Sequence, residues 1–170
     1  MIKREKSIKL LNKAIGGEMT ALNQYMYFHF LLEDMGYDYL SAYFKRTGIQ
    51  EMRHVEKFAE RVLYLKGEIE MQASAPVEKI HDVKAMLEKA EAMESETIAN
   101  YNEWANLCGT DADLASKQLF ESIILEEESH QDHFDTELEN MGKFGDKYLA
   151  LQSIAHSRNA ASLGGNVTAE

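Results

Sequence analysis

The chain contains few of the features that mark secreted, membrane or disordered proteins. It has one cysteine, Cys108, among 170 residues, so it cannot form an internal disulfide, and this favours a reducing compartment. One proline, 28% charged and 45% hydrophobic residues do not fit a disordered chain. No run approaches the roughly 18 apolar residues of a transmembrane helix, and the first residues lack a signal peptide's apolar core. We therefore expect a cytoplasmic protein with no membrane partner.

Positive charge is also scarce. Lysine and arginine total 18 against 29 acidic residues, which gives a formal net charge of −11. A direct nucleic-acid partner is disfavoured, because phosphate binding requires a basic face. An acidic surface instead attracts cations over long range.

Helical periodicity covers almost the whole chain and predicts an all-α protein with one core. The expected helices are about Ser7–Met35, Tyr39–Lys66, Val77–Leu107, Asp111–Met141 and a shorter Asp146–Arg158. The expected breaks are at Gly36, Gly67, Gly109, Gly142 and Gly145, with Asp111 as a candidate N-cap. We expect one domain over residues 1–158 and a flexible tail over 159–170.

Loop lengths predict the order of the helices. The first two helices, and likewise the third and fourth, are joined by few residues and should form antiparallel hairpins. The link Glu68–Pro76 and the residues after it are longer. About 12 extended residues span the roughly 40 Å of such a helix, so the second and third helices can run parallel. An up-down-up-down bundle with a loose loop is the alternative.

One pattern of acids and histidines occurs twice, 76 positions apart. Its members are Glu18, Glu51 and His54 in the first half and Glu94, Glu127 and His130 in the second. The same shift relates three aromatic pairs, namely Tyr25 with Tyr101, Phe44 with Phe120, and Phe58 with Phe134. A repeat that keeps four carboxylates and two imidazoles in register indicates a two-fold site for two metal ions.

The place of these residues in their helices supports a metal site. Glu18 and Glu94 stand in the middle of apolar stripes that should enter the core. Burying an ionised carboxylate without a partner costs several kcal/mol, so each needs a cation or a proton. A single Glu-x-x-His pair is more often a surface feature, and the common offset is what favours a dinuclear centre. Oxygen and nitrogen ligands without sulfur suit iron or manganese.

From about Ser7 to Leu149 the chain resembles the bacterioferritins. The resemblance rests on Leu-Asn-Lys at 11–13, Asn-Gln-Tyr at 23–25, Glu-Met-Arg-His at 51–54, Ala-Glu-Arg at 59–61, Glu-Glu-Ser-His at 127–130, and Glu18 and Glu94. In this family the methionine that corresponds to Met52 ligates haem iron together with its counterpart from a second subunit. One position beyond Glu51 on a helix points about 100° away, so Met52 can face a partner while Glu51 faces the core.

The resemblance implies a ferritin-like four-helix bundle with one long crossover and a short fifth helix. It implies iron storage in a cage of 24 subunits, with ferroxidase activity at a di-iron centre that uses O₂ or H₂O₂. Haem or a related iron porphyrin, one per two subunits, and a ferredoxin-type reductant are also implied. Tyr25 and Tyr101 are expected to hydrogen-bond to the ligands or to supply an electron.

Two other classes remain open at this point. A non-storing di-iron peroxidase of the rubrerythrin type usually carries a cysteine-ligated iron module, which one cysteine cannot build. A dodecameric mini-ferritin binds iron between subunits and lacks the double Glu-x-x-His pattern.

Two residues depart from the bacterioferritin pattern. Arg46 and Gln50 stand where some bacterioferritins have a histidine and an aspartate that help iron or electrons reach the interior of the cage. His29, His81 and His156 are expected to be solvated or polar-rim residues, His133 a supporting or transit group, and Cys108 an inert one.

Overall fold

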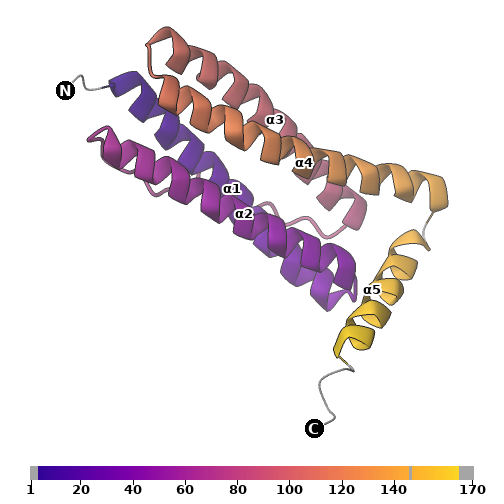
Figure 1. Cartoon of the computed structure of the whole chain (residues 1–170). Helices are drawn as coiled ribbons and strands as arrows, with labels where there is room; N and C mark the ends of the chain where they lie inside the picture. Colours follow the sequence, from indigo (N-terminus) through magenta and orange to yellow (C-terminus); the bar gives the residue numbers. More distant parts are fainter. Residues whose placement is uncertain (1–3, 146, 165–170) are drawn as a thin grey trace.

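The computed structural model describes residues 4–145 and 147–164, and within them the chain forms five α-helices (Figure 1). Their bounds are α1 Glu5–Asp34, α2 Asp38–Tyr64, α3 Val83–Thr110, α4 Leu114–Phe144 and α5 Tyr148–Gly164. None of the helices in this part of the chain is long and apolar enough to cross a membrane. The expected all-α class is confirmed.

Side-chain capping explains why two helix starts differ from the prediction. α3 begins at Val83 rather than Val77, because Asp82 accepts a hydrogen bond of 2.8 Å from the backbone N–H of Ala85. The N-cap of α4 is Asp113, so the prediction of Asp111 for this role was wrong. Asp111 follows the last residue of α3 instead.

The helix ends also shift. Gly109 and Gly142 lie inside α3 and α4, and were wrongly predicted to be breaks. Gly36 follows α1 with a φ of 80°, a left-handed conformation that glycine adopts at little cost. α5 continues to Gly164, beyond the predicted Arg158. The division into a domain and a tail stays a prediction, since residues 165–170 lie outside the described part.

The crossover between α2 and α3 runs beside α1 from its first half towards its C-terminal end. The Asn12 side chain bonds the backbone of Glu68 and Glu70, and the Gln24 side chain bonds the backbone carbonyl and N–H of Glu78 at 3.0 and 2.8 Å. The link therefore returns along the bundle and starts α3 parallel to α2. This confirms the predicted crossover and rules out the up-down-up-down alternative.

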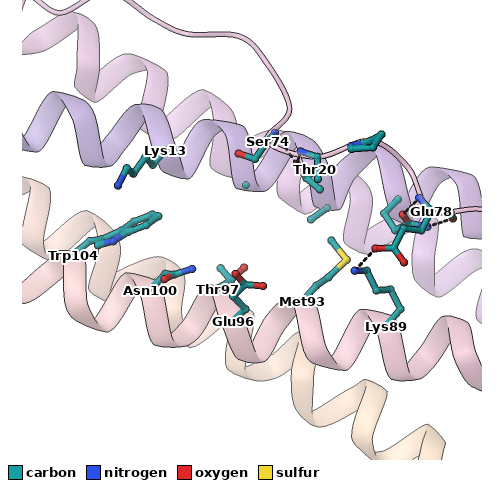
Figure 2. A pocket seen from close by; sticks show the side chains of 15 residues that line it. Lys13, Thr20, Ser74, Glu78, Lys89, Met93, Glu96, Thr97, Asn100 and Trp104 are labelled. Carbon is teal, nitrogen blue, oxygen red and sulfur yellow. Dashed lines mark hydrogen bonds and ion pairs between the residues drawn. The ribbon is translucent and has the colours of Figure 1, made fainter.

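The close approach of the crossover to α1 explains why position 16 is a glycine. The N–H of Ser74 donates to the carbonyl of Gly16 at 3.0 Å, and a Cβ at Gly16 would lie 2.5 Å from the Ser74 hydroxyl. Figure 2 shows the hollow beyond this contact, a cavity of about 360 Å³ between α1, α3 and the crossover. It is partly closed by the ion pair of Lys89 with Glu78 at 2.6 Å.

Two apolar clusters divide the core along its length. One contains Leu11, Ile15, Phe58, Tyr101 and Phe120, and the other contains Tyr25, Phe28, Phe44, Leu87 and Phe134. On every helix of the bundle the repeated acids and histidines lie between these two clusters. The apolar residues thus enclose a polar layer near the middle of the bundle.

The contact between Gln24 and the crossover can be tested by mutation. Gln24→Ala should lower the free energy of unfolding by about 1–3 kcal/mol, because the backbone groups of Glu78 lose their partners in a part-buried place. Urea denaturation would measure the change. Asn23→Ala, at the exposed neighbouring position, is the control and should cost less than about 0.5 kcal/mol. Equal losses in both variants would contradict a specific role for Gln24.

Candidate metal centre

The six repeated residues come from all four helices of the bundle and meet in its core. Glu18 lies on α1, Glu51 and His54 on α2, Glu94 on α3, and Glu127 and His130 on α4. None is more than 4% exposed. The sequence repeat therefore corresponds to one site in space.

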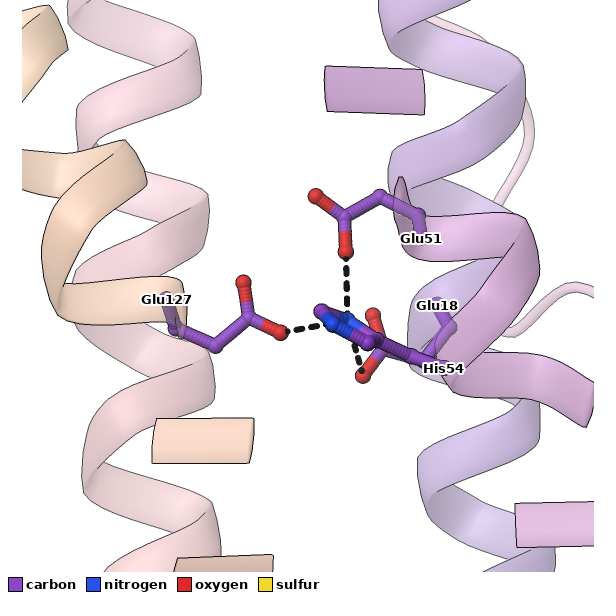
Figure 3. Close-up of side chains that lie close together, drawn as sticks. All are labelled: Glu18, Glu51, His54 and Glu127. Carbon is purple, nitrogen blue, oxygen red and sulfur yellow. Dashed lines mark hydrogen bonds and ion pairs between the residues drawn. The ribbon is translucent and has the colours of Figure 1, made fainter. Parts of the chain in front are cut away.

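The ligand atoms fall into two overlapping groups. Glu18, Glu51, His54 and Glu127 form one group, drawn in Figure 3, and Glu51, Glu94, Glu127 and His130 form the other. Within each group one donor atom of every residue lies within 4.8 Å of the others. Glu51 and Glu127 belong to both groups. The arrangement thus has two four-ligand positions with two shared carboxylates.

Both imidazoles present Nδ1 to the carboxylates. His54 Nδ1 lies 2.9 Å from Glu51 Oε2 and 2.9 Å from Glu127 Oε1. His130 Nδ1 lies 3.0 Å from Glu127 Oε2 and 3.1 Å from Glu51 Oε1. The Nε2 atoms of both rings face outward, away from the shared carboxylates.

The centre is electrostatically incomplete as protein alone. Glu51 Oε1 and Glu127 Oε1 are buried and make no hydrogen bond of acceptable geometry, although an imidazole nitrogen is near each. Two protonated imidazoles can balance only two of the four carboxylates, so in the metal-free protein the other two must hold protons to avoid a costly excess of negative charge in the core. Two divalent cations would balance the four carboxylates and allow both imidazoles to be neutral ligands. The donor set therefore fits two cations such as iron or manganese.

The pKa values of the ligand side chains also reflect the burial of several carboxylates close together. Burial, followed by repulsion from neighbouring carboxylates, raises the pKa of Glu18 and of Glu94 well above the usual value. Burial raises the pKa of Glu127 too, but its close contacts with the imidazoles of His130 and His54 lower it more, to about 2. Burial lowers the pKa of His54 and His130, yet hydrogen bonds to the carboxylates outweigh it and raise both, that of His130 to about 9.

Two tyrosines connect the repeats crosswise. The Tyr25 hydroxyl donates to Glu94 Oε1 at 2.5 Å, and the Tyr101 hydroxyl donates to Glu18 Oε1 at 2.5 Å. Each phenol therefore bonds the glutamate of the other half, not the one seven residues before it. Each of these two carboxylates is thus held in place by a phenol from the other half of the chain.

Two further residues contact the outward nitrogens of the histidines. His54 Nε2 lies 3.2 Å from Glu126 Oε2, and His130 Nε2 lies 3.2 Å from Gln50 Oε1. Glu126 was missed in the sequence, and Gln50 was noted only as a departure from relatives. The 76-residue shift that relates the ligands also relates Gln50 to Glu126, so the repeat contained the signal.

Met52 does not point into the centre. Its side chain is 43% exposed on α2, and the neighbouring Ile49 is 38% exposed. This fits the expectation that Met52 faces outward while Glu51 faces the core.

The histidines outside the pattern differ in environment. His29 is buried, and its Nδ1 lies 2.9 Å from the Ser41 hydroxyl, so the prediction of a solvated or rim residue was wrong. His81 is exposed, while the side chain of His156 lies outside the described part. The His133 ring stacks on Tyr43 with centroids 3.5 Å apart. Cys108 is buried, and it is the free cysteine of the chain.

The fold and the centre define a class: a ferritin-like bundle with a carboxylate–histidine site for two cations at mid-length. A family model of the ferritin-like domain matches residues 8–144. A bacterioferritin of Desulfovibrio desulfuricans is 36% identical over 98% of this chain and 93% of its own length. A bacterioferritin of Brucella melitensis is 34% identical over 91% of this chain and 96% of its own length. The chain belongs to the bacterioferritins, a family of iron-storage proteins.

Solved structures agree with this assignment. The crystal structure of the D. desulfuricans bacterioferritin, described as showing its diiron site in different catalytic states, has a TM-score of 0.86 at 37% identity and covers 88% of both chains. That of Rhodobacter capsulatus, described with a metal-free dinuclear site and haem iron in a special position, also has a TM-score of 0.86, at 31% identity, covering 90% of this chain and 96% of that chain.

Competition between metal ions and protons gives a pH prediction. With a pKa of about 9, above the usual 6.5, His130 is protonated at neutral pH in the metal-free protein, and a cation must displace that proton. The raised pKa values of Glu18 and Glu94 act in the same direction. Affinity for Co²⁺ should therefore rise with pH, about tenfold per unit for each proton displaced, and less steeply above about pH 9. Calorimetry in buffers of different ionisation enthalpy would count the protons, and a pH-independent affinity would contradict the assignment.

Proposed function

We propose that the chain is a ferroxidase that stores iron, and that it oxidises Fe²⁺ at the centre formed by the six repeated residues. The observation that carries this proposal is the pair of overlapping four-ligand groups that share two buried carboxylates. Glu51 and Glu127, which belong to both groups, would be shared by the two ions. Glu18 with His54, and Glu94 with His130, are the terminal ligands.

The shared carboxylates explain why two electrons can be taken together. Two Fe²⁺ ions held in adjacent positions supply two electrons to one oxidant, so O₂ is reduced to H₂O₂, or H₂O₂ to water, with the protons taken from solvent. Carboxylates and imidazoles tolerate both oxidation states of iron and leave positions open for the oxidant. One-electron reduction, which would release radicals, is avoided.

The chain's own residues hold this geometry before any ion arrives. The hydrogen bonds from Tyr25 and Tyr101 fix the carboxylates of Glu94 and Glu18. The apolar clusters on either side restrict water, which strengthens the electrostatic interactions of the ligands. We further propose that Tyr25 or Tyr101 supplies an electron, which their direct contacts with Glu94 and Glu18 support.

We also propose the assembly and the partners. Copies of the chain form a cage of 24, its fifth helix lines the four-fold contacts, and the Fe³⁺ product is stored inside as oxide. The protein acts in the cytoplasm, and a ferredoxin-type reductant supplies electrons when iron is released. The net charge of −11 would attract Fe²⁺ to such a cage.

Haem binding is proposed for Met52. The thioether is partly exposed on α2, so it can reach a haem or related iron porphyrin at a contact between two copies. A neutral, soft sulfur ligand from each copy favours the Fe²⁺ state of the haem. One haem per two subunits, held by Met52 of each copy, would supply a redox group for electron transfer to stored iron.

Removal of one terminal carboxylate tests the ferroxidase centre. Glu94→Ala should slow rapid Fe²⁺ oxidation by about 100-fold or more while the cage still assembles, because the ion on that side is no longer held in reacting geometry. Stopped-flow absorbance and native mass measurement would follow both properties. Glu96→Ala removes an exposed acid from the same helix and should leave the rate unchanged. An unaltered rate in Glu94→Ala would show that the site is misassigned.

Replacement of the thioether tests the haem site. Met52→Leu keeps the volume and should cost less than about 1.5 kcal/mol of stability, yet the protein should purify without haem. Iron oxidation should continue, and release of stored iron by a reductant should slow. Met35→Leu, at a position of similar exposure (41%), is the control and should retain haem. Stoichiometric haem in Met52→Leu would refute the role of Met52.

A further inference from the structure

The ligand shell of the centre is nearly symmetric, but the residues behind the two histidines are not. Glu126 and Gln50 occupy equivalent positions of the repeat, and each contacts the Nε2 of a ligand histidine at 3.2 Å. One is a carboxylate and the other is a neutral amide. The two contacts therefore match in position and distance but differ in the charge of the group that contacts the ring.

The carboxylate side is reinforced by a cation. Lys57 Nζ lies 2.7 Å from Glu126 Oε1, and this contact orients the carboxylate whose other oxygen bonds His54. The repeat places His133 at the position equivalent to Lys57, and the His133 ring stacks on Tyr43. Only the His54 side therefore has a fixed anionic acceptor behind the ring.

The character of this acceptor changes how well the ring binds a cation. A carboxylate that accepts the Nε2–H of an imidazole raises the basicity of Nδ1, the nitrogen that faces the centre. An amide oxygen accepts the same hydrogen bond without a full negative charge, so it raises that basicity less. The two imidazoles should thus differ as ligands although their carboxylate neighbours correspond.

The two ligand histidines also differ in how close they lie to solvent. A cavity of about 650 Å³ is lined by His130, Gln50, Arg46, Glu126 and His133, and His54 is not among its lining residues. The His130 side chain is 4% exposed, and that of His54 is fully buried. Of the two ligand histidines, His130 is therefore the one that borders this cavity.

We propose that Glu126 and Gln50 are positioning residues that make the two cation positions of the centre unequal. The position that includes His54 binds its ion tightly and fills first. The position that includes His130 binds less tightly and exchanges its ion through the cavity beside Gln50. This rests on the proposed function, because it assumes that two cations bind at the six ligands.

The first test is stepwise binding of Co²⁺ to the metal-free, full-length assembly, followed by its ligand-field absorption. The unmodified protein should bind two ions per chain in separate steps. Gln50→Glu should strengthen the second step by about 10–100-fold, and Glu126→Gln should weaken the first by a similar factor. Glu128→Gln makes the same charge change at an exposed position next to Glu127 and should alter neither step.

The double variant that exchanges the two residues, Gln50→Glu with Glu126→Gln, is the decisive measurement. Anomalous diffraction from crystals given one equivalent of Co²⁺ per chain should place the ion beside His54 in the unmodified protein and beside His130 in the exchanged variant. A merely structural role for either residue would weaken both positions together and would not invert the order.

The outcomes separate the two proposals. Two ions of equal affinity in the unmodified protein, or an order that the exchange leaves unaltered, would overturn this inference and leave the ferroxidase proposal standing. Failure to bind two ions at all would overturn both. Unfolding temperatures of the metal-free variants, expected to stay close to that of the parent, check that the exchanged side chains leave the fold intact.

Discussion

The structure depends on the burial of four carboxylates at one level of a helix bundle. An ionised carboxylate in a core is tolerated only with a compensating charge, and two imidazoles cannot compensate four of them. The rest of the molecule is arranged around this requirement. Each helix of the four-helix bundle contributes to the polar layer, two apolar clusters close it on either side, and two tyrosines hold Glu18 and Glu94 from opposite halves. The core of this chain therefore combines an apolar interior with a centre whose charge must be balanced by protons or by cations.

The crossover gives the centre its two-fold form. Because the link returns beside α1 and is bonded by Asn12 and Gln24, the two hairpins lie in equivalent orientations. Equivalent residues of the two halves then face each other across the core, and two carboxylates can be shared. The six ligands are symmetric, but the residues that contact the outward nitrogens of the histidines are not. The first half has the amide of Gln50 where the second half has the carboxylate of Glu126.

Much of this could be predicted from the sequence, and the failures have physical reasons. Helical stripes and loop lengths predicted the hairpins and the crossover. The start of α3 was placed too early because Asp82 provides a side-chain cap that periodicity does not register. Asp111 and Asp113 are both plausible caps in sequence, and the structure distinguishes them because Asp113 accepts from the N–H of Ser116 and is also bonded by Arg61 of α2. His29 was expected near solvent, and its burial depends on packing against Ser41 of the neighbouring helix.

By itself, the sequence determined which residues form the centre, because a repeat at constant spacing on helices leaves few faces on which four acids and two histidines can lie. It also determined the fold class, since period 3.6 and short loops admit few alternatives. The tertiary structure alone decided which carboxylates are shared, which tyrosine bonds which glutamate, and which residues stand behind the histidines. Those relations join atoms on different helices, and their distances follow from how the helices are packed against one another, which no spacing along a single helix contains.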